Sequence, residues 1–145
     1  ALLDLAEQYA PKLENTIVME TGGMKGHRAE MSKTELHRVL CAAFGVDKIH
    51  SEYGMAELMS QGYSVGEGLF AAPPWMKVMT RDVNNPFRVL NEGQRGAINI
   101  IDLANIYSCS FIATQDMGIV YADGTFRIEG RVTDADIRGC NLLVQ

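Results

Sequence analysis

The chain has 145 residues, the length of one ordinary domain, and 47% of them are hydrophobic while 21% are charged, as in most globular proteins. It carries 13 Lys and Arg against 18 Asp and Glu, which gives a net charge of -5, and it has no basic run. This balance argues against nucleic acid or an anionic membrane surface as a partner, and the apolar runs are too short to span a bilayer. The three cysteines, Cys41, Cys109 and Cys140, are odd in number and widely spaced, which favours reduced thiols in the cytoplasm over a disulfide framework.

The first half of the chain predicts a helix and then two short strands joined by a second helix. Residues 2–9 have a helical pattern, and residues 16–20 (TIVME) form an apolar strand that leads into a glycine-rich turn at 21–26 (TGGMKG). The second helix is predicted over 31–45 and the second strand over 48–53 (KIHSEY). A strand, a helix and a strand in this order predict a βαβ unit with parallel strands.

The helix predicted over 31–45 has the clearest boundaries. Ser32 suits the N-cap, and Glu35 three residues later completes a capping box. Gly45 suits the C-terminal end of the helix, because glycine readily adopts the left-handed conformation found there.

The second half of the chain, after Pro73-Pro74, predicts short strands joined by the turn segments NNP, NEGQRG and ADG. The predicted strands are WMKVMTRD, FRVL, GAINIIDL, MGIVY and TFRIEGR. Asp123-Gly124 indicates a tight hairpin with a type I′ turn. The expected fold class is therefore α/β. A subdomain of residues 1–72 contains the βαβ unit, and a small, mostly antiparallel, barrel-like β subdomain of residues 73–145 ends in a tail.

Two glycine-containing loops follow the predicted strands, at the ends where parallel α/β sheets bind ligands. Gly22-Gly23 follows the first strand and Tyr53-Gly54 the second. Glycines let the backbone approach a flat ligand, a tyrosine ring can stack on it, and the nearby Glu57 carboxylate is a hard oxygen ligand for Mg²⁺. Together they predict a nucleotide site on the βαβ unit. Taken singly, the glycines can be a plain turn, Tyr53 a packing residue and Glu57 a helix-start acid.

Four segments in order resemble the adenylate-forming enzymes, the superfamily of acyl-CoA synthetases, luciferases and related ligases. TGGMKG (21–26) is similar to their glycine-pair loop, and SEYGMAE (51–57) to their Tyr-Gly-x-Thr-Glu motif. EGQRGAINIID (92–102) resembles Gly-x-x-Gly-Glu-Leu-x-Ile, and residues 114–139 resemble the series Thr-Gly-Asp, Asp-Gly, Gly-Arg and Ile-Arg-Gly. No single motif is specific, whereas the collinear set is.

Within that superfamily, SEYGMAELMSQGYS (51–64) and the ending DADIRGCNLLVQ (134–145) are most similar to the acyl-protein synthetases, which include the fatty-acid-activating component of the bacterial luminescence reductase. The resemblance implies the C-terminal portion of an ATP-dependent, Mg²⁺-dependent ligase. Such an enzyme converts a fatty or aryl carboxylic acid into an acyl-adenylate and passes the acyl group to a protein thiol or to CoA. An oligomer is compatible with this resemblance.

The resemblance also gives roles to the residues that match the motifs. The glycine pair lies along the adenine, the tyrosine stacks on it, one aspartate binds the ribose hydroxyls, an arginine reaches the ribose or the phosphates, and the glutamate binds Mg²⁺. The implied nucleotide-binding residues are Gly22, Gly23, Tyr53, Gly54 and Asp116, and the implied catalytic residues are Glu57, Arg131 and Cys140.

Cys140 has two interpretations. A cysteine near the C-terminus of an acyl-protein synthetase takes the acyl group, and a thiolate suits that role. The other interpretation is a small buried residue beside Leu142 and Leu143, because cysteine is often buried.

The chain departs from the family pattern at Ala56, where threonine is usual, and at Gln115, where glycine is usual. The phosphate-binding loop of the family is expected upstream of residue 1, so this portion alone is expected to be inactive. Two alternatives to an acyl-protein synthetase remain: an acyl-CoA ligase of the phenylacetate type, and a non-catalytic nucleotide-binding remnant, which Ala56 slightly favours.

Overall fold

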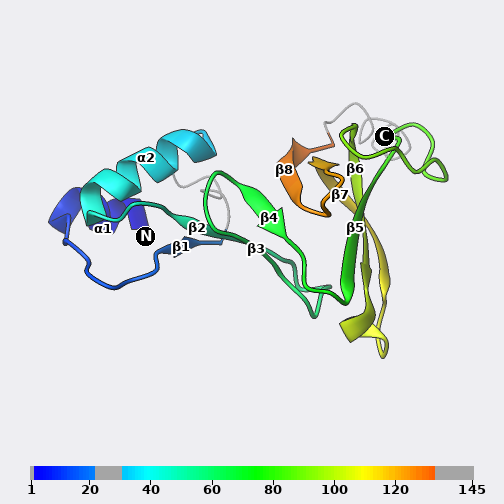
Figure 1. The fold of residues 1–145 in the computed structure, drawn as a ribbon, viewed down its shortest axis with the longest axis horizontal. Coiled ribbons are helices and arrows are strands. Elements are labelled where there is room, and N and C mark those ends of the chain that lie inside the picture. Colours follow the sequence, from blue (N-terminus) through cyan, green and yellow to red (C-terminus); the bar gives the residue numbers. More distant parts are fainter. Residues whose placement is uncertain (1, 22–30, 133–145) are drawn as a thin grey trace, which may run out of the picture. The chain divides into compact units, whose positions relative to one another are not determined.

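The computed structural model describes residues 2–21 and 31–132 (Figure 1). Contacts divide the chain into two compact parts. Unit 1 contains Ala1–Met55 and Gln61–Ala71, and unit 2 contains Ala56–Ser60 and Ala72–Gln145. The fold is mixed α/β and rich in sheet. Among the helices of the described residues, none is both long enough and apolar enough to cross a membrane.

Unit 1 contains two helices that pack side by side, α1 (Leu2–Tyr9) and α2 (Lys33–Phe44) (Figure 1). Their apolar faces bury one cluster, whose buried members are Leu3, Ala6, Val18, Leu40, Phe44 and Ile49. The predicted helix boundaries are confirmed. Ser32 Oγ accepts a hydrogen bond from the Glu35 N–H at 3.2 Å, and Gly45 has a φ of 70°.

The strands of unit 1 follow the order β1-β2-β3-β4. They are β1 (Met19–Glu20), β2 (His50–Tyr53), β3 (Gly62–Ser64) and β4 (Leu69–Ala71). β1 pairs with β2 in parallel, and the other two pairings are antiparallel. The first two strands are shorter than predicted, and β3 and β4 were not predicted, because three residues are too few to show an alternating pattern.

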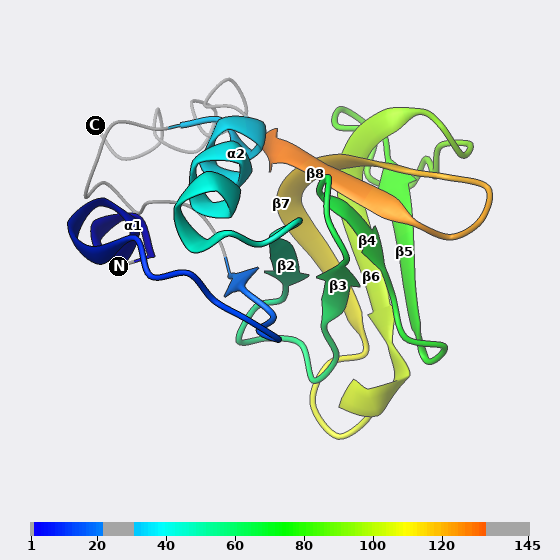
Figure 2. The ribbon, with the colours of Figure 1, turned by 60° about the vertical axis from the view of Figure 1, so that its left-hand side comes forward.

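Unit 2 is built on four strands in the order β8-β7-β6-β5, and all three pairings are antiparallel, as predicted (Figure 2). The strands are β5 (Met76–Arg81), β6 (Arg95–Asp102), β7 (Phe111–Val120) and β8 (Phe126–Arg131), with the short 3₁₀ helix η1 (Leu103–Asn105) after β6. The segment FRVL (87–90) contributes a single bridge, Arg81 to Val89, instead of the predicted strand.

The hairpin between β7 and β8 forms where the Asp-Gly pair predicted it, but the predicted type I′ turn is wrong. That turn needs positive φ at two successive residues, whereas Gly124 alone has it here, with a φ of 82°. The Tyr121 N–H donates to the Thr125 carbonyl at 2.8 Å, which leaves a three-residue loop. Asp123 stabilises that loop by accepting from the Thr125 N–H at 3.0 Å and hydroxyl at 2.6 Å.

Candidate functional site

Tyr53 and Gly54 lie in unit 1 at the end of β2. The burial of β2 alternates, so Tyr53 is only 9% exposed, and its ring centroid lies 6.0 Å from that of Phe70 with a tilt of 59°. A Cβ at position 54 would lie only 3.1 Å from the Gln61 side chain, so glycine, which has no Cβ, fits this position best. The structure thus places the Tyr53 ring next to Phe70 within unit 1. Stacking of Tyr53 on a nucleotide base stays a prediction.

Glu57 lies in the turn Ala56–Ser60, which belongs to unit 2. It is exposed, and this segment consists of turns and bends. The alternative interpretation of Glu57 as a helix-start acid is therefore wrong. The backbone of the turn is held by the Asn105 side-chain amide, which donates to the Glu57 carbonyl at 2.7 Å.

Asp116 and Arg131 are brought together by strand register, because they face each other across β7 and β8. Arg131 Nε lies 3.6 Å from Asp116 Oδ1, and the two side chains are 72% and 19% exposed. Gln115 Oε1 also lies 3.5 Å from Arg131 Nη2. The arrangement presents a carboxylate with two acceptor oxygens next to a permanent cation.

Asp102 is a buried carboxylate that the sequence interpretation missed. It ends β6 with 0% exposure and accepts four hydrogen bonds, which come from Met59, Ser60 and Ala104. Burial raises the pKa of this carboxyl, but the hydrogen bonds from Ser60, Ala104 and Met59 outweigh burial and lower the pKa below its usual value. The signal in the sequence is a charged residue at the end of the mostly apolar segment INII (98–101), which indicates a carboxylate in need of partners but not which partners.

A second polar cluster, in unit 1, was also missed. Glu20 ends β1 with 6% exposure, and Lys33 Nζ lies 2.8 Å from its carboxylate. His37 Nε2 lies 3.5 Å from the same carboxylate and 3.5 Å from Ser51 Oγ. Lys33 and His37 lie on α2, so the cluster joins α2 to the end of β1 and to the first half of β2.

The predicted residues Gly22, Gly23 and Cys140 lie outside the described residues. The other two cysteines are free thiols. Burial, together with the nearby Asp47 carboxylate, raises the pKa of the Cys41 thiol, which makes it a poor nucleophile. Cys109 is exposed, and its Sγ lies 3.2 Å from the Phe111 carbonyl.

Of the predicted site residues, the structure brings Asp116 and Arg131 into contact, and Glu57 belongs to the same unit. In the described ranges, no group of three or more His, Cys, Asp and Glu could hold a metal ion. A cavity of about 350 Å³ in unit 2 lies between β5, the segment 89–92 and the hairpin, and it is lined by none of the predicted residues.

No model of a protein family matches the chain. Over 135 residues it is 25% identical to the long-chain-fatty-acid–luciferin-component ligase of Vibrio harveyi. The match covers 86% of this chain, and the chain spans only 35% of the length of that curated relative.

Two solved structures have the same fold. The O-succinylbenzoate coenzyme A synthetase (MenE) of Bacillus subtilis, in complex with ATP and magnesium, superposes on 92% of this chain with a TM-score of 0.62 and 19% identity, over 30% of its own length. ATP-bound MatB of Rhodopseudomonas palustris superposes on 81% of the chain with a TM-score of 0.59 and 19% identity, over 26% of its own length. The predicted resemblance to the adenylate-forming enzymes, and among them to the fatty-acid ligase of bacterial luminescence, is therefore confirmed.

Proposed function

We propose that this chain is part of an ATP-dependent acyl-protein synthetase, which activates a fatty acid as its acyl-adenylate and then transfers the acyl group to a thiol. The observation that carries the proposal is the similarity to a fatty-acid ligase over 86% of the chain. A match of that extent must include the middle of the chain, and with it Tyr53, Glu57 and Asp116.

The described residues fit a nucleotide. The two oxygens of Asp116 can accept hydrogen bonds from the two vicinal hydroxyls of a ribose, and the Arg131 guanidinium beside it is a permanent cation for a phosphate. ATP is bound in the solved MatB and MenE structures that share this fold.

The residues also fit Mg²⁺ that arrives with ATP. Mg²⁺ keeps several water ligands and is bound through one or two carboxylates together with substrate phosphates, so a single exposed carboxylate at Glu57 is sufficient. When bound, the ion neutralises charge on the phosphates. Glu57 holds the ion, Asp116 orients the ribose, and Arg131 adds positive charge.

The acyl group is proposed to move to Cys140 before it reaches a protein acceptor. This step is assigned from the sequence resemblance, with support from the raised pKa of Cys41, which disfavours that thiol as the nucleophile. In the step, the thiolate attacks the acyl carbonyl, a thioester forms, and AMP leaves with the electron pair of the acyl–phosphate bond.

The proposal is tested with the full-length protein by ATP–pyrophosphate exchange that depends on a fatty acid. Glu57→Gln should lower exchange strongly, because the neutral amide is a poor Mg²⁺ ligand. Labelled fatty acid should become attached to the wild-type protein, be released by hydroxylamine and be absent from Cys140→Ser, while Cys109→Ser keeps the label. Exchange at the wild-type rate in Glu57→Gln would rule out the metal role.

An acyl-CoA ligase is the second candidate, because a coenzyme A synthetase has the same fold. Offering CoA and the protein acceptor in parallel separates the two. Formation of acyl-CoA with no labelled Cys140 would replace the acyl-protein synthetase by the CoA ligase. Absence of exchange with any carboxylic acid would favour a non-catalytic nucleotide-binding protein.

A further inference from the structure

We propose that Asp102 is a positioning residue for metal binding: it fixes the backbone of the turn Ala56–Ser60 and so sets the place of Glu57. The inference rests on the proposed function, because it takes Glu57 as the Mg²⁺ ligand.

The geometry around Asp102 shows how the turn is held. Oδ2 accepts hydrogen bonds from the backbone N–H groups of Met59 at 3.0 Å and Ser60 at 2.8 Å. Oδ1 accepts from the Ser60 hydroxyl at 2.7 Å and from the Ala104 N–H at 3.1 Å. One carboxylate therefore joins the turn to the start of η1, although Ser60 lies 42 positions earlier in the sequence.

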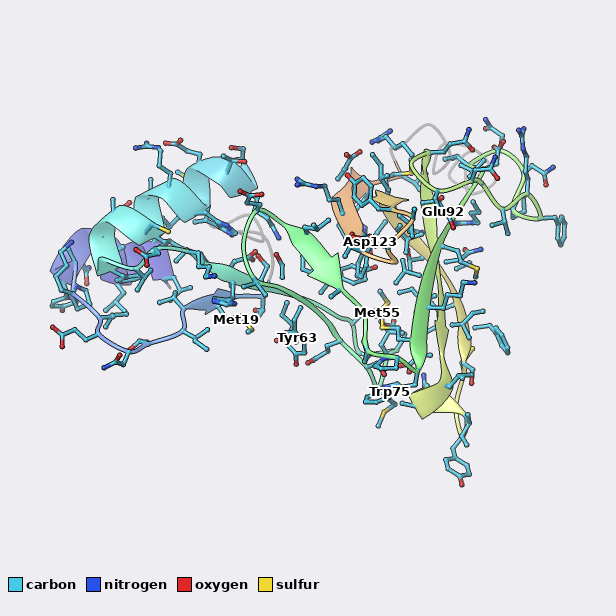
Figure 3. The ribbon with its side chains drawn as sticks, in the orientation of Figure 1. Met19, Met55, Tyr63, Trp75, Glu92 and Asp123 are labelled. Atoms are coloured by element: carbon cyan, nitrogen blue, oxygen red, sulfur yellow. The ribbon has the colours of Figure 1, made fainter. Side chains whose placement is uncertain are left out.

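Two other side chains complete the attachment. Asn105 is 5% exposed, and its amide donates to the carbonyls of Glu57 at 2.7 Å and Cys109 at 2.9 Å. Trp75, just ahead of β5 in Figure 3, donates from its indole N–H to Ser60 Oγ at 2.9 Å. The Ser60 hydroxyl thus donates to Asp102 and accepts from Trp75 at the same time.

These contacts hold the backbone of the turn and leave the Glu57 carboxylate accessible to solvent. Atoms of residues 57, 59 and 60 are held on the side of β6 and η1, whereas Glu57 itself is exposed. A metal ligand needs this combination, because its position must be fixed while its oxygens remain accessible. Hydrogen bonds from neutral donors depend steeply on distance and angle, so they fix the turn in one geometry.

Asp102→Asn tests the inference, because it keeps the size of the side chain but replaces one acceptor oxygen by an NH₂ donor facing N–H donors. In the full-length protein, fatty-acid-dependent ATP–pyrophosphate exchange is measured against the concentration of free Mg²⁺. Loss of a group that supports a metal ligand typically weakens metal binding by about 10- to 100-fold. The Mg²⁺ concentration for half-maximal exchange should therefore rise about tenfold or more in Asp102→Asn, and saturating Mg²⁺ should restore most of the rate.

Asp123→Asn is the matched control. It makes the same chemical change in the same unit, in a hairpin at the other end of β7, and Figure 3 shows Asp123 well apart from Trp75. Its Mg²⁺ dependence should equal that of the wild type. A readout that does not depend on activity is peptide-resolved hydrogen exchange at residues 56–60, which should become faster in Asp102→Asn but not in Asp123→Asn, because the Met59 and Ser60 amides donate to Asp102.

The outcomes separate this inference from the proposed function. If Glu57→Gln abolishes exchange while folded Asp102→Asn has the wild-type Mg²⁺ dependence, Asp102 has no positioning role and the function stands. If the wild type shows no exchange, or if Glu57→Gln exchanges normally, the metal role of Glu57 fails and the inference fails with it.

A second variant covers the case in which Asp102→Asn does not fold. Trp75→Phe removes one donor to Ser60 from a residue that is 53% exposed, and should shift the Mg²⁺ dependence in the same direction by a smaller factor. The control is Tyr107→Phe, a 98% exposed aromatic residue of the same unit. No shift in Trp75→Phe relative to Tyr107→Phe would overturn the inference.

Discussion

Among the described residues, each unit buries one carboxylate at the end of a strand, and the two are stabilised in different ways. In unit 1, Glu20 at the end of β1 receives a cation, with Lys33 Nζ at 2.8 Å. In unit 2, Asp102 at the end of β6 receives three backbone amides and one hydroxyl, all of them neutral. The same functional group is thus held by charge in one unit and by directed hydrogen bonds in the other.

The difference matters because the two kinds of interaction fix geometry to different degrees. Attraction between charges falls off slowly with distance, and solvent weakens it here because the Lys33 side chain is 41% exposed. Hydrogen bonds weaken steeply once their distance or angle departs from the ideal, and the Asp102 carboxylate that accepts them is fully buried. Asp102 is therefore suited to fixing the backbone of a turn, and Glu20 to attaching a helix to a sheet.

The largest effect is expected from Asp102→Ala. The buried amide and hydroxyl of Ser60 would lose their acceptor, and each buried donor left without one costs about 1–3 kcal/mol, whereas water can reach the partly buried amides of Met59 and Ala104. The free energy of unfolding measured in urea should fall by about 2 kcal/mol or more. Peptide-resolved hydrogen exchange should show the fastest new exchange at residues 56–60. A urea midpoint equal to those of the wild type and of the Asp123→Ala control would contradict this.

A smaller effect is expected from Lys33→Met. The substitution keeps an apolar stem near the Phe70 ring, over which Nζ lies at 5.0 Å, but it removes the cation from Glu20. Because His37 remains 3.5 Å from that carboxylate, the loss should be about 1–3 kcal/mol. It should also depend on salt: 1 M NaCl should destabilise the wild type more than the variant. Lys77→Met, at an exposed lysine of β5, is the control, and an equal salt response in both variants would show that the ion pair contributes nothing.

Acid should destabilise unit 2 through Asp102. The pKa of this carboxyl is lowered in the folded chain, so its contribution to stability is complete above its ordinary pKa of about 3.9 and is lost as the pH falls through the lower, folded value. The free energy of unfolding is measured between pH 6 and pH 2, which spans about two pH units on either side of that pKa. It should fall less steeply with decreasing pH in Asp102→Asn than in the wild type. The pKa of Asp123 is also lowered, by hydrogen bonds from Thr125, so Asp123→Asn supplies the background for an exposed carboxylate. Parallel curves for the wild type and Asp102→Asn would contradict the assignment.

Local patterns in the sequence predicted the elements whose signals lie close together in the chain. Ser32, Glu35 and Gly45 predicted the limits of α2, and the short strands joined by turn segments, together with Asp123-Gly124, predicted an antiparallel region with a hairpin. Strands β3 and β4 are three residues long and were missed, and the type I′ turn was wrong because neighbouring residues do not settle which of them takes positive φ.

The polar networks could not be predicted, because their partners are far apart in the sequence. Asp102 meets Ser60 across 42 positions, and Asn105 meets Glu57 across 48. The motifs indicated which residues carry chemistry, such as Glu57 and Asp116, but not which residues hold them. Only the register of β7 with β8 shows that Arg131 faces Asp116.

The smallest effect on stability is expected from Arg131→Ala. This variant distinguishes a residue that stabilises the fold from one that binds a ligand. The ion pair of Arg131 with Asp116 is 3.6 Å long and the arginine side chain is 72% exposed, so Arg131→Ala should cost less than about 1 kcal/mol of unfolding free energy. The matched control is Arg88→Ala, because Arg88 forms a similar exposed pair with Asp82 at 3.5 Å in the same unit. Both variants should therefore unfold at nearly the wild-type urea concentration. If Arg131 supplies positive charge to ATP, its variant alone should raise the KM for ATP in pyrophosphate exchange, by about tenfold for each 1.4 kcal/mol of binding lost. Equal KM values for the two variants would leave Arg131 as a surface ion pair with no part in nucleotide binding, whereas a large loss of stability in Arg131→Ala would make it a structural residue of unit 2.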